Sequence, residues 1–117
     1  MVYLIYFKNR EFKCSLDVTV DLIGGKWKVL ILWRLKNGLL RFNELKRAIP
    51  NVTQKMLTQQ LRELEQDGLI NRKIYAEVPP KVEYSLTVLG ESLIPIFEEI
   101  CNWGDRYLEQ SSGGHIT

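Results

Sequence analysis

Apolar residues in the middle of the chain recur at helical spacing in two neighbouring segments. In the first, Phe42, Leu45 and Ile49 stand at positions i, i+3 and i+7, which places them on one stripe of a helix. Pro50 ends this helix because proline disfavours the helical conformation of the residue before it. A second helix follows after a short turn. The pattern over residues 41–68 therefore predicts a helix-turn-helix.

The second helix is expected to begin after Thr53 and to stop at Gly68. Threonine is a favoured N-cap because its hydroxyl accepts a hydrogen bond from a free backbone amide, and glycine is a favoured C-terminal stop. One face of this helix is apolar and suits a core: Leu57, Leu61 and Leu64. Another face carries amides, hydroxyls and cations with almost no acid: Gln54, Lys55, Thr58, Gln59 and Arg62.

This polar face has the side-chain types that read DNA. Long donors and amides hydrogen-bond base edges and phosphates when a helix lies in the major groove. Polar helix faces are also common in soluble proteins of every kind, so the face alone leaves both interpretations open. The expected DNA contacts of the helix-turn-helix are Arg41, Thr53, Gln54, Lys55, Thr58, Gln59 and Arg62.

Two β-rich segments follow the second helix. Segments 70–75 and 82–86 are separated by Pro79 and Pro80, and the second alternates apolar and polar positions. They predict a two-stranded hairpin over residues 70–86. A basic hairpin directly after a recognition helix is the arrangement of a winged helix, in which the wing touches phosphates or the minor groove. The expected contacts of the wing are Arg72, Lys73 and Lys81.

The first third of the chain predicts supporting elements. Residues 26–35 are apolar around most of their circumference and predict a buried central helix, in which Trp27 and Trp33 are core or subunit-contact residues. A short helix over residues 14–23 is expected before it. The apolar run over residues 2–7 fits either a strand or a helical arm.

The last helix is predicted over residues 87–109, bent by Pro95, which interrupts the helical hydrogen bonds. It presents more apolar surface than a small domain needs, so we expect a dimer interface; packing onto the domain's own core is the alternative. The expected interface residues are Leu93, Phe97, Ile100 and Trp103. The fold class is therefore α+β, mainly α: one winged helix-turn-helix domain over residues 1–110 with a C-terminal dimerisation helix, then a flexible tail over residues 111–117.

Charge is unevenly distributed along the 117 residues, although the formal net charge is only +2. Residues 1–40 carry seven Lys or Arg against three Asp or Glu, and residues 41–82 carry eight against five. Residues 83–117 carry one against six. A basic front and an acidic C-terminal element indicate that the first part meets a polyanion.

Other classes of protein are disfavoured. The apolar run at the start is too short for a membrane span and lacks the features of a signal peptide, so we expect a cytoplasmic protein without membrane contact. Two cysteines and the single His115 fit no zinc site, and neither a metal nor a cofactor is expected. An enzyme is not expected, because the part before the tail has no histidine and its carboxylates are scattered.

Cys14 is a candidate redox sensor. It precedes a helix whose N-terminal amides carry partial positive charge, and Lys8, Arg10 and Lys13 come shortly before it, so both effects favour the thiolate. A thiolate reacts with peroxide, hypochlorite or quinones. The alternative is a small buried apolar residue. Cys101 lies on the apolar seam and is expected in the core, with an intersubunit disulfide as its other possible role.

Ordered blocks of sequence stand at Ile23 to Trp27, Arg41-Phe42 with Glu44-Leu45, Lys55 to Thr58, Leu61 to Glu65 with Asp67 to Leu69, Val78 to Thr87, Gly90 and Trp103. Together these blocks resemble the HxlR family of bacterial winged-helix transcription regulators, which is related in architecture to the MarR group. The resemblance covers roughly Cys14 to Leu108. One departure is Ser15, where the family often has proline after the cysteine.

The resemblance implies a homodimer held by N- and C-terminal helices, with one recognition helix and one wing per subunit. It also implies that Cys14 senses oxidants or a small reactive inducer, as in some members. A dimer of this kind is expected to bind an inverted-repeat operator in double-stranded DNA as a sequence-specific repressor or activator. The alternative is a winged-helix protein-interaction module without DNA binding, which has no need for Lys55, Arg62, Lys73 and Lys81 to converge.

Overall fold

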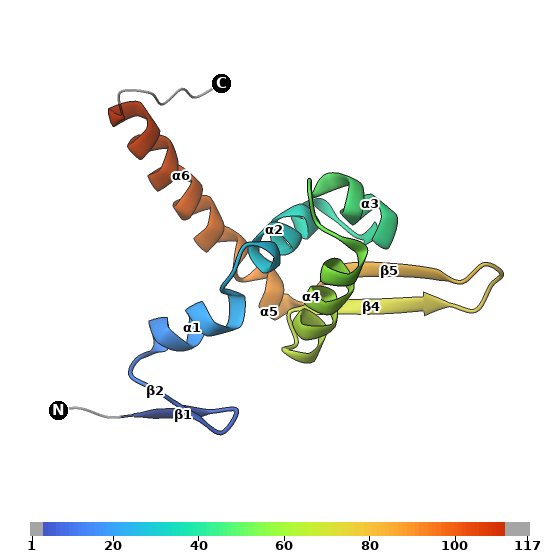
Figure 1. Ribbon diagram of the computed structural model, residues 1–117, viewed down its shortest axis with the longest axis horizontal. Coiled ribbons are helices and arrows are strands. Elements are labelled where there is room, and N and C mark those ends of the chain that lie inside the picture. Colours follow the sequence, from blue (N-terminus) through green and yellow to red (C-terminus); the bar gives the residue numbers. More distant parts are fainter. Residues whose placement is uncertain (1–3, 112–117) are drawn as a thin grey trace.

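A computed structural model describes residues 4–111 of the chain and confirms the winged helix-turn-helix (Figure 1). Its elements, in chain order, are β1 (Ile5–Phe7), β2 (Arg10–Phe12), α1 (Ser15–Ile23), α2 (Trp27–Arg34), the 3₁₀ turn η1 (Leu35–Asn37), β3 (Leu40–Arg41), α3 (Phe42–Ala48), α4 (Gln54–Gln66), β4 (Ile70–Tyr75), β5 (Lys81–Leu86), α5 (Val88–Glu91) and α6 (Ile94–Gln110). The predicted tail beyond Ser111 lies outside the described residues.

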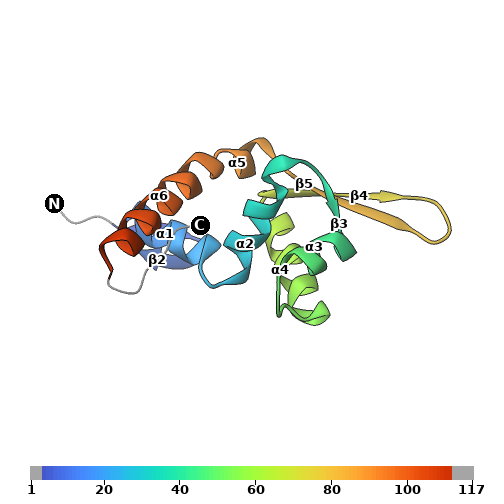
Figure 2. The ribbon, with the colours of Figure 1, turned by 90° about the horizontal axis from the view of Figure 1, so that it is seen from above.

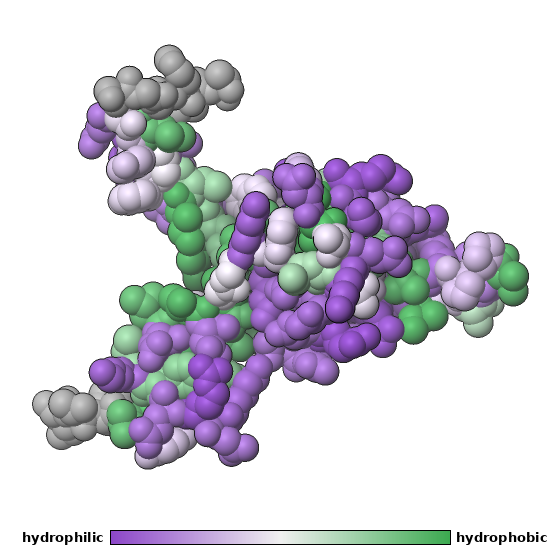
Figure 3. All heavy atoms as spheres, in the orientation of Figure 1, coloured by the Kyte–Doolittle hydropathy of each residue, from purple (hydrophilic) through white to green (hydrophobic). Residues whose placement is uncertain are grey.

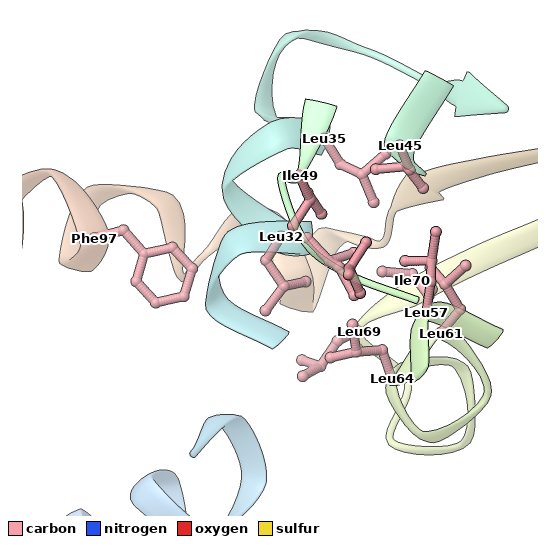
Figure 4. Close-up of a cluster of buried hydrophobic side chains, with 12 residues drawn as sticks. Leu32, Leu35, Leu45, Ile49, Leu57, Leu61, Leu64, Leu69, Ile70 and Phe97 are labelled. Atoms are coloured by element: carbon pink, nitrogen blue, oxygen red, sulfur yellow. The ribbon is translucent and has the colours of Figure 1, made fainter. Parts of the chain in front are cut away.

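The core is built by the apolar faces of α2, α3 and α4, as the helical spacing predicts. Figure 4 shows their side chains converging on one cluster, with Phe97 reaching it from α6. The side chains buried there to 2% exposure or less include Ile31, Leu32, Leu35, Leu45, Ile49, Leu57, Leu61, Leu64 and Ile70. Trp27 and Trp33 are half-buried and pack against this cluster. The cluster holds α4 firmly while its opposite face remains in solvent.

Both ends of α4 are fixed by the caps expected from the sequence. The Thr53 hydroxyl oxygen accepts a hydrogen bond from the Met56 amide at 3.1 Å. At the other end Gly68 has φ +75°, a conformation that glycine adopts without steric cost. The Leu69 amide then donates to the Leu64 carbonyl at 3.0 Å, which closes the helix. These caps fix the length and direction of the helix that carries the predicted DNA contacts.

The wing is a three-stranded antiparallel sheet in the order β3-β5-β4. The hairpin of β4 and β5 projects from the body on the side away from α1 and α6 (Figure 1). The sequence predicted these two strands and missed β3, which has only two residues and therefore shows no alternation. In the register of the sheet, Arg41 of β3 lies opposite Glu83 of β5, and Lys73 of β4 lies opposite the same residue from the other side.

The start of the described chain is a β-hairpin, which decides between the strand and the helical arm considered for it. Strands β1 and β2 pair with Ile5 opposite Phe12. Lys8 and Asn9 form the turn with φ of 54° and 58°, the positive values that tight two-residue hairpins require. Phe12 is buried, so the hairpin is anchored by an apolar side chain.

The predicted single helix over residues 87–109 is wrong in one respect: the structure has two helices, α5 and α6. Residues 92–93 form a turn between them, and Pro95 is the second residue of α6. Proline is well tolerated in the first turn, where its missing amide has no helical partner. Pro95 therefore begins a helix instead of bending one.

Helix α5 is tied to the end of α4 through Thr87 and Gly90. The Thr87 hydroxyl donates to the Gly68 carbonyl at 2.7 Å and accepts from the Gly90 amide at 3.0 Å. A Cβ atom at Gly90 would stand 2.1 Å from the Leu69 carbonyl oxygen, so no larger residue fits without a backbone shift. This close approach fixes α5 against the end of α4.

Helices α1 and α6 extend from the same side of the body as two arms (Figures 1 and 2). Apolar residues gather where the arms leave the body (Figure 3). The large apolar side chains of the two arms that are exposed in the single chain are Leu16, Val20, Ile96, Ile100, Trp103, Tyr107 and Leu108. Trp103 and Tyr107 stack with ring centroids 5.5 Å apart. An unpaired chain thus leaves an apolar surface in water.

Candidate nucleic-acid interface

The polar face of α4 is assembled as predicted. Its five side chains are exposed and line one shallow hollow on the surface: Gln54, Lys55, Thr58, Gln59 and Arg62. The Thr58 hydroxyl donates to the Gln54 carbonyl at 2.8 Å, so it faces an incoming ligand as an acceptor. Lys55 and Arg62 belong to none of the ion pairs formed within residues 4–111. The face therefore presents donors and uncompensated positive charge.

Two other predicted DNA contacts, Thr53 and Arg41, lie outside the polar face of α4. Thr53 is exposed, but its hydroxyl oxygen is engaged as the N-cap of α4. Arg41 stands immediately before α3, where its backbone amide donates to Glu44 Oε1 at 2.8 Å. The Arg41 side chain lines a hollow with Asn43 and Arg47 of α3. Asn43 and Arg47 were not among the predicted DNA contacts. Their i, i+4 spacing, which places them on one face of α3 beside Arg41, is the sequence signal that could have indicated them.

The structure separates the three cations of the wing onto two faces, because successive residues of a strand point to opposite sides. Arg72 lies on the inner face, toward α4, and lines a hollow with Thr58, Arg62 and Tyr84. Its Nε lies 3.2 Å from Glu65 Oε1. Burial raises the pKa of Tyr84 above its ordinary value of 10.0, so this hydroxyl stays neutral. Arg72 is therefore partly neutralised within the chain.

Lys73 and Lys81 lie on the outer face of the wing with Tyr75 between them. Each Nζ lies 4.8 Å from the centroid of the Tyr75 ring, a distance at which a cation is attracted to the aromatic face. Lys81 Nζ also lies 3.5 Å from Glu83 Oε2. The Tyr75 hydroxyl, followed by the charges of Lys81 and Arg41, holds the pKa of Glu83 below its ordinary value of 4.5, although burial opposes this shift.

The tip of the wing, residues 76–80, has no basic side chain and includes the acidic Glu77. Val78 there is 99% exposed. The positive charge of the wing is thus carried by its strands, nearer to α3 and α4, and not by its tip.

Cys14 is exposed and occupies the N-cap position of α1. Two of the cations expected to favour its thiolate are engaged elsewhere: Lys8 pairs with Asp67, and Arg10 pairs with Asp21 at 2.7 Å. What remains of that argument is Lys13, whose side chain belongs to none of the ion pairs formed within residues 4–111, and the helix N-terminus. The expected core position of Cys101 is wrong, because this residue is exposed on α6.

The four residues predicted for the dimer interface fall into two groups, one exposed and one packed against the chain's own core. Ile100 and Trp103 are exposed, at 59% and 61%. Phe97 is 3% exposed and belongs to the chain's own core, so we remove it from the expected interface. Leu93 is half-buried and packs against the same core. The alternative considered from the sequence, packing onto the domain itself, thus holds for the start of α6.

Within the described residues, no group of three or more His, Cys, Asp or Glu side chains could hold a metal ion. No helix in residues 4–111 is long and apolar enough to cross a membrane.

Comparison with known proteins agrees with this geometry. The family described as HxlR-like helix-turn-helix matches residues 22–112. The chain is 61% identical over 101 residues to the HTH-type transcriptional regulator YkvN of Bacillus subtilis, which covers 86% of each chain. A crystal structure of the HTH-type transcriptional regulator ytcD has a TM-score of 0.79 and 53% identity, covering 82% of this chain and 98% of that one.

A second solved structure, described as the redox regulator HypR in its oxidised form, has a TM-score of 0.74 and 50% identity. It covers 80% of this chain and 96% of that one. With a family match over most of its length and relatives above half identity, this chain belongs to the HxlR-like helix-turn-helix family of transcriptional regulators.

Proposed function

We propose that this transcriptional regulator binds its operator by inserting α4 into the major groove. The observation that carries the proposal is the polar face of α4, whose five side chains share one hollow and whose two cations have no partner within residues 4–111. Lys and Arg donate to guanine and to phosphates, and Gln reads adenine. Both cations are therefore available to phosphates or base edges without first breaking an ion pair of the described residues.

The wing and the start of α3 bind the phosphate backbone on either side of this groove. Arg41, Lys73 and Lys81 supply sequence-independent attraction, which positions the recognition helix without reading bases. Arg72 adds less, since Glu65 already neutralises part of its charge. Asn43 and Arg47 extend the same backbone contact along α3.

The protein acts in the cytoplasm as a homodimer whose subunits meet through their arms. The exposed apolar side chains of α6, chiefly Ile100 and Trp103, support this assembly because apolar surface removed from water stabilises association. A twofold dimer presents two copies of α4, which fit an inverted repeat with half-site centres about 34–36 Å apart, or a multiple of that spacing.

Cys14 is the thiol through which an oxidant or electrophile changes DNA binding. Its exposure and its N-cap position support this role, and a similar protein is described as a redox regulator. A modification at the start of α1 would act on the arms and so on the distance between the two recognition helices.

Selection of bound fragments from a genomic DNA library, with and without an oxidant, tests the function. We expect enrichment of an inverted repeat in the reduced protein and loss of that enrichment after oxidation. A library from which no sequence is enriched would instead favour the alternative, a winged-helix module that docks another protein.

A further inference from the structure

A carboxylate stands in the middle of the cationic outer face of the wing. Glu83 lies on the central strand β5, with Arg41 opposite it on β3 and Lys73 opposite it on β4. Lys81, two residues earlier, shares the same side of β5. Three cations from three strands therefore surround one acid, which is unexpected on a surface that meets DNA.

Glu83 forms an ion pair with Lys81, and two further cations stand opposite it in the register of the sheet. Its Oε2 lies 3.5 Å from Lys81 Nζ, and its side chain is only 12% exposed. Directly opposed residues of antiparallel strands have Cβ atoms about 4.5–5.5 Å apart, so Arg41 and Lys73 flank Glu83 at the backbone. Within residues 4–111 neither of these two cations forms an ion pair with it. The Tyr75 hydroxyl and the charges of Lys81 and Arg41 keep the pKa of Glu83 low, so the carboxylate is ionised at neutral pH.

Simple electrostatics makes such an acid unfavourable for DNA binding, since it lowers the attraction of the wing for phosphates. Long Lys and Arg side chains also lose rotamer freedom when they bind, and that loss is smaller if they are already held in place. A central carboxylate that restrains three cations can therefore favour binding overall. The two effects predict opposite results when Glu83 is neutralised.

We propose that Glu83 is a positioning residue for DNA binding, whose carboxylate holds Lys81 by an ion pair and attracts Arg41 and Lys73 from the neighbouring strands into one phosphate-binding surface. This inference rests on the proposed function. Glu83 itself touches no DNA; it acts through the three cations around it. The three cations and the one carboxylate leave a net charge of +2 on this surface, and the carboxylate holds the cations in a fixed geometry.

The test is Glu83→Gln, an isosteric change that removes the charge, measured against the selected operator and a scrambled duplex of equal length. The matched control is Glu77→Gln, which removes the same charge from the exposed tip of the same wing. Affinity is measured over a series of salt concentrations, because the slope of log affinity against log salt counts the phosphates neutralised. A merely structural loss would not change this slope.

We expect Glu83→Gln to weaken both duplexes by roughly 3- to 10-fold and to reduce the salt slope by about one to two, while Glu77→Gln binds as the native protein or tighter. Glu83→Asp keeps the charge on a shorter side chain and should retain most of the native slope. Native or tighter binding by Glu83→Gln would overturn the inference, and so would weaker binding with an unchanged slope. Failure of the native protein to bind either duplex would instead overturn the proposed function.

Discussion

Lys28 Nζ in α2 lies 3.3 Å from Glu63 Oε1 in α4, so an ion pair crosses the contact that holds the recognition helix against the core. The two side chains differ in exposure, at 11% for Lys28 and 40% for Glu63. The more buried partner is the cation. Water can therefore solvate the Glu63 carboxylate if the pair is broken, whereas an unpaired Lys28 ammonium would remain largely out of water.

This asymmetry predicts that Glu63→Gln costs more stability than Lys28→Met. Glu63→Gln leaves a mostly buried charge without its partner and should lower the free energy of unfolding by about 1–3 kcal/mol. Lys28→Met replaces the buried cation by an apolar side chain and should cost less than about 1 kcal/mol. Urea unfolding at one fixed protein concentration measures both, and the opposite order would contradict the assignment of Lys28 as the buried partner.

The polar face of α4 gives the second prediction. Lys55→Ala combined with Arg62→Ala should weaken the free energy of operator binding by about 2–4 kcal/mol, since each side chain contributes one base or phosphate contact. Gln59→Ala should cost about 1–3 kcal/mol on the operator and relax its sequence preference. The control is Arg34→Ala with Lys36→Ala, which removes the same charge from outside α4 and the wing. Equal affinities for the two double variants would contradict the groove assignment.

The helix-turn-helix could be predicted from the sequence because its signals agree at every level. Apolar residues at helical spacing, Thr53 as a cap and Gly68 as a stop all indicate one structure, and the core and caps confirm it. The short β3 was missed because two residues show no period. The predicted bend at Pro95 is wrong because proline bends the interior of a helix but suits its first turn, and no pattern in the sequence marks the break at residues 92–93.

The candidate site was predicted as a set of residues but not as an arrangement. The alternation of a strand already implies that Arg72 and Lys73 point to opposite faces, so the three wing cations do not form one contact surface. The roles of Glu83 and Glu65 depend on which strand or helix lies beside them, which no local pattern gives. For Phe97, one apolar seam faced two possible partners, and only the packing against α2 decided between them.

Helix α6 provides the third prediction, which compares two aromatic residues. Trp103→Ala should shift the protein from dimer to monomer while leaving the fold of each chain intact, because Trp103 is 61% exposed in the single chain. Phe97→Ala should instead destabilise the fold by about 3–5 kcal/mol, the usual cost of truncating a buried aromatic residue. Sedimentation and thermal unfolding separate these outcomes. If the native protein sediments as a monomer at micromolar concentration, the proposed dimerisation is wrong.

The last prediction concerns the thiol at the start of α1. Treatment of the reduced protein with a peroxide or a quinone should lower operator affinity, because the modified Cys14 lies at the start of the arm that, in the proposed dimer, sets the distance between the two recognition helices. Cys14→Ser should bind the operator as the untreated protein does and should keep that affinity after treatment.

Cys101→Ser is the matched control, since Cys101 is the other exposed thiol and lies on the second arm. If oxidation forms an adduct or sulfenic acid on Cys14 alone, this variant should respond as the native protein does. If the product is a disulfide between the two arms, Cys101→Ser should also resist oxidation, and non-reducing electrophoresis of the native protein should show a covalent dimer. Equal loss of binding in the native protein and in Cys14→Ser would exclude Cys14 as the sensor, and the groove contacts of α4 would be unaffected by that result.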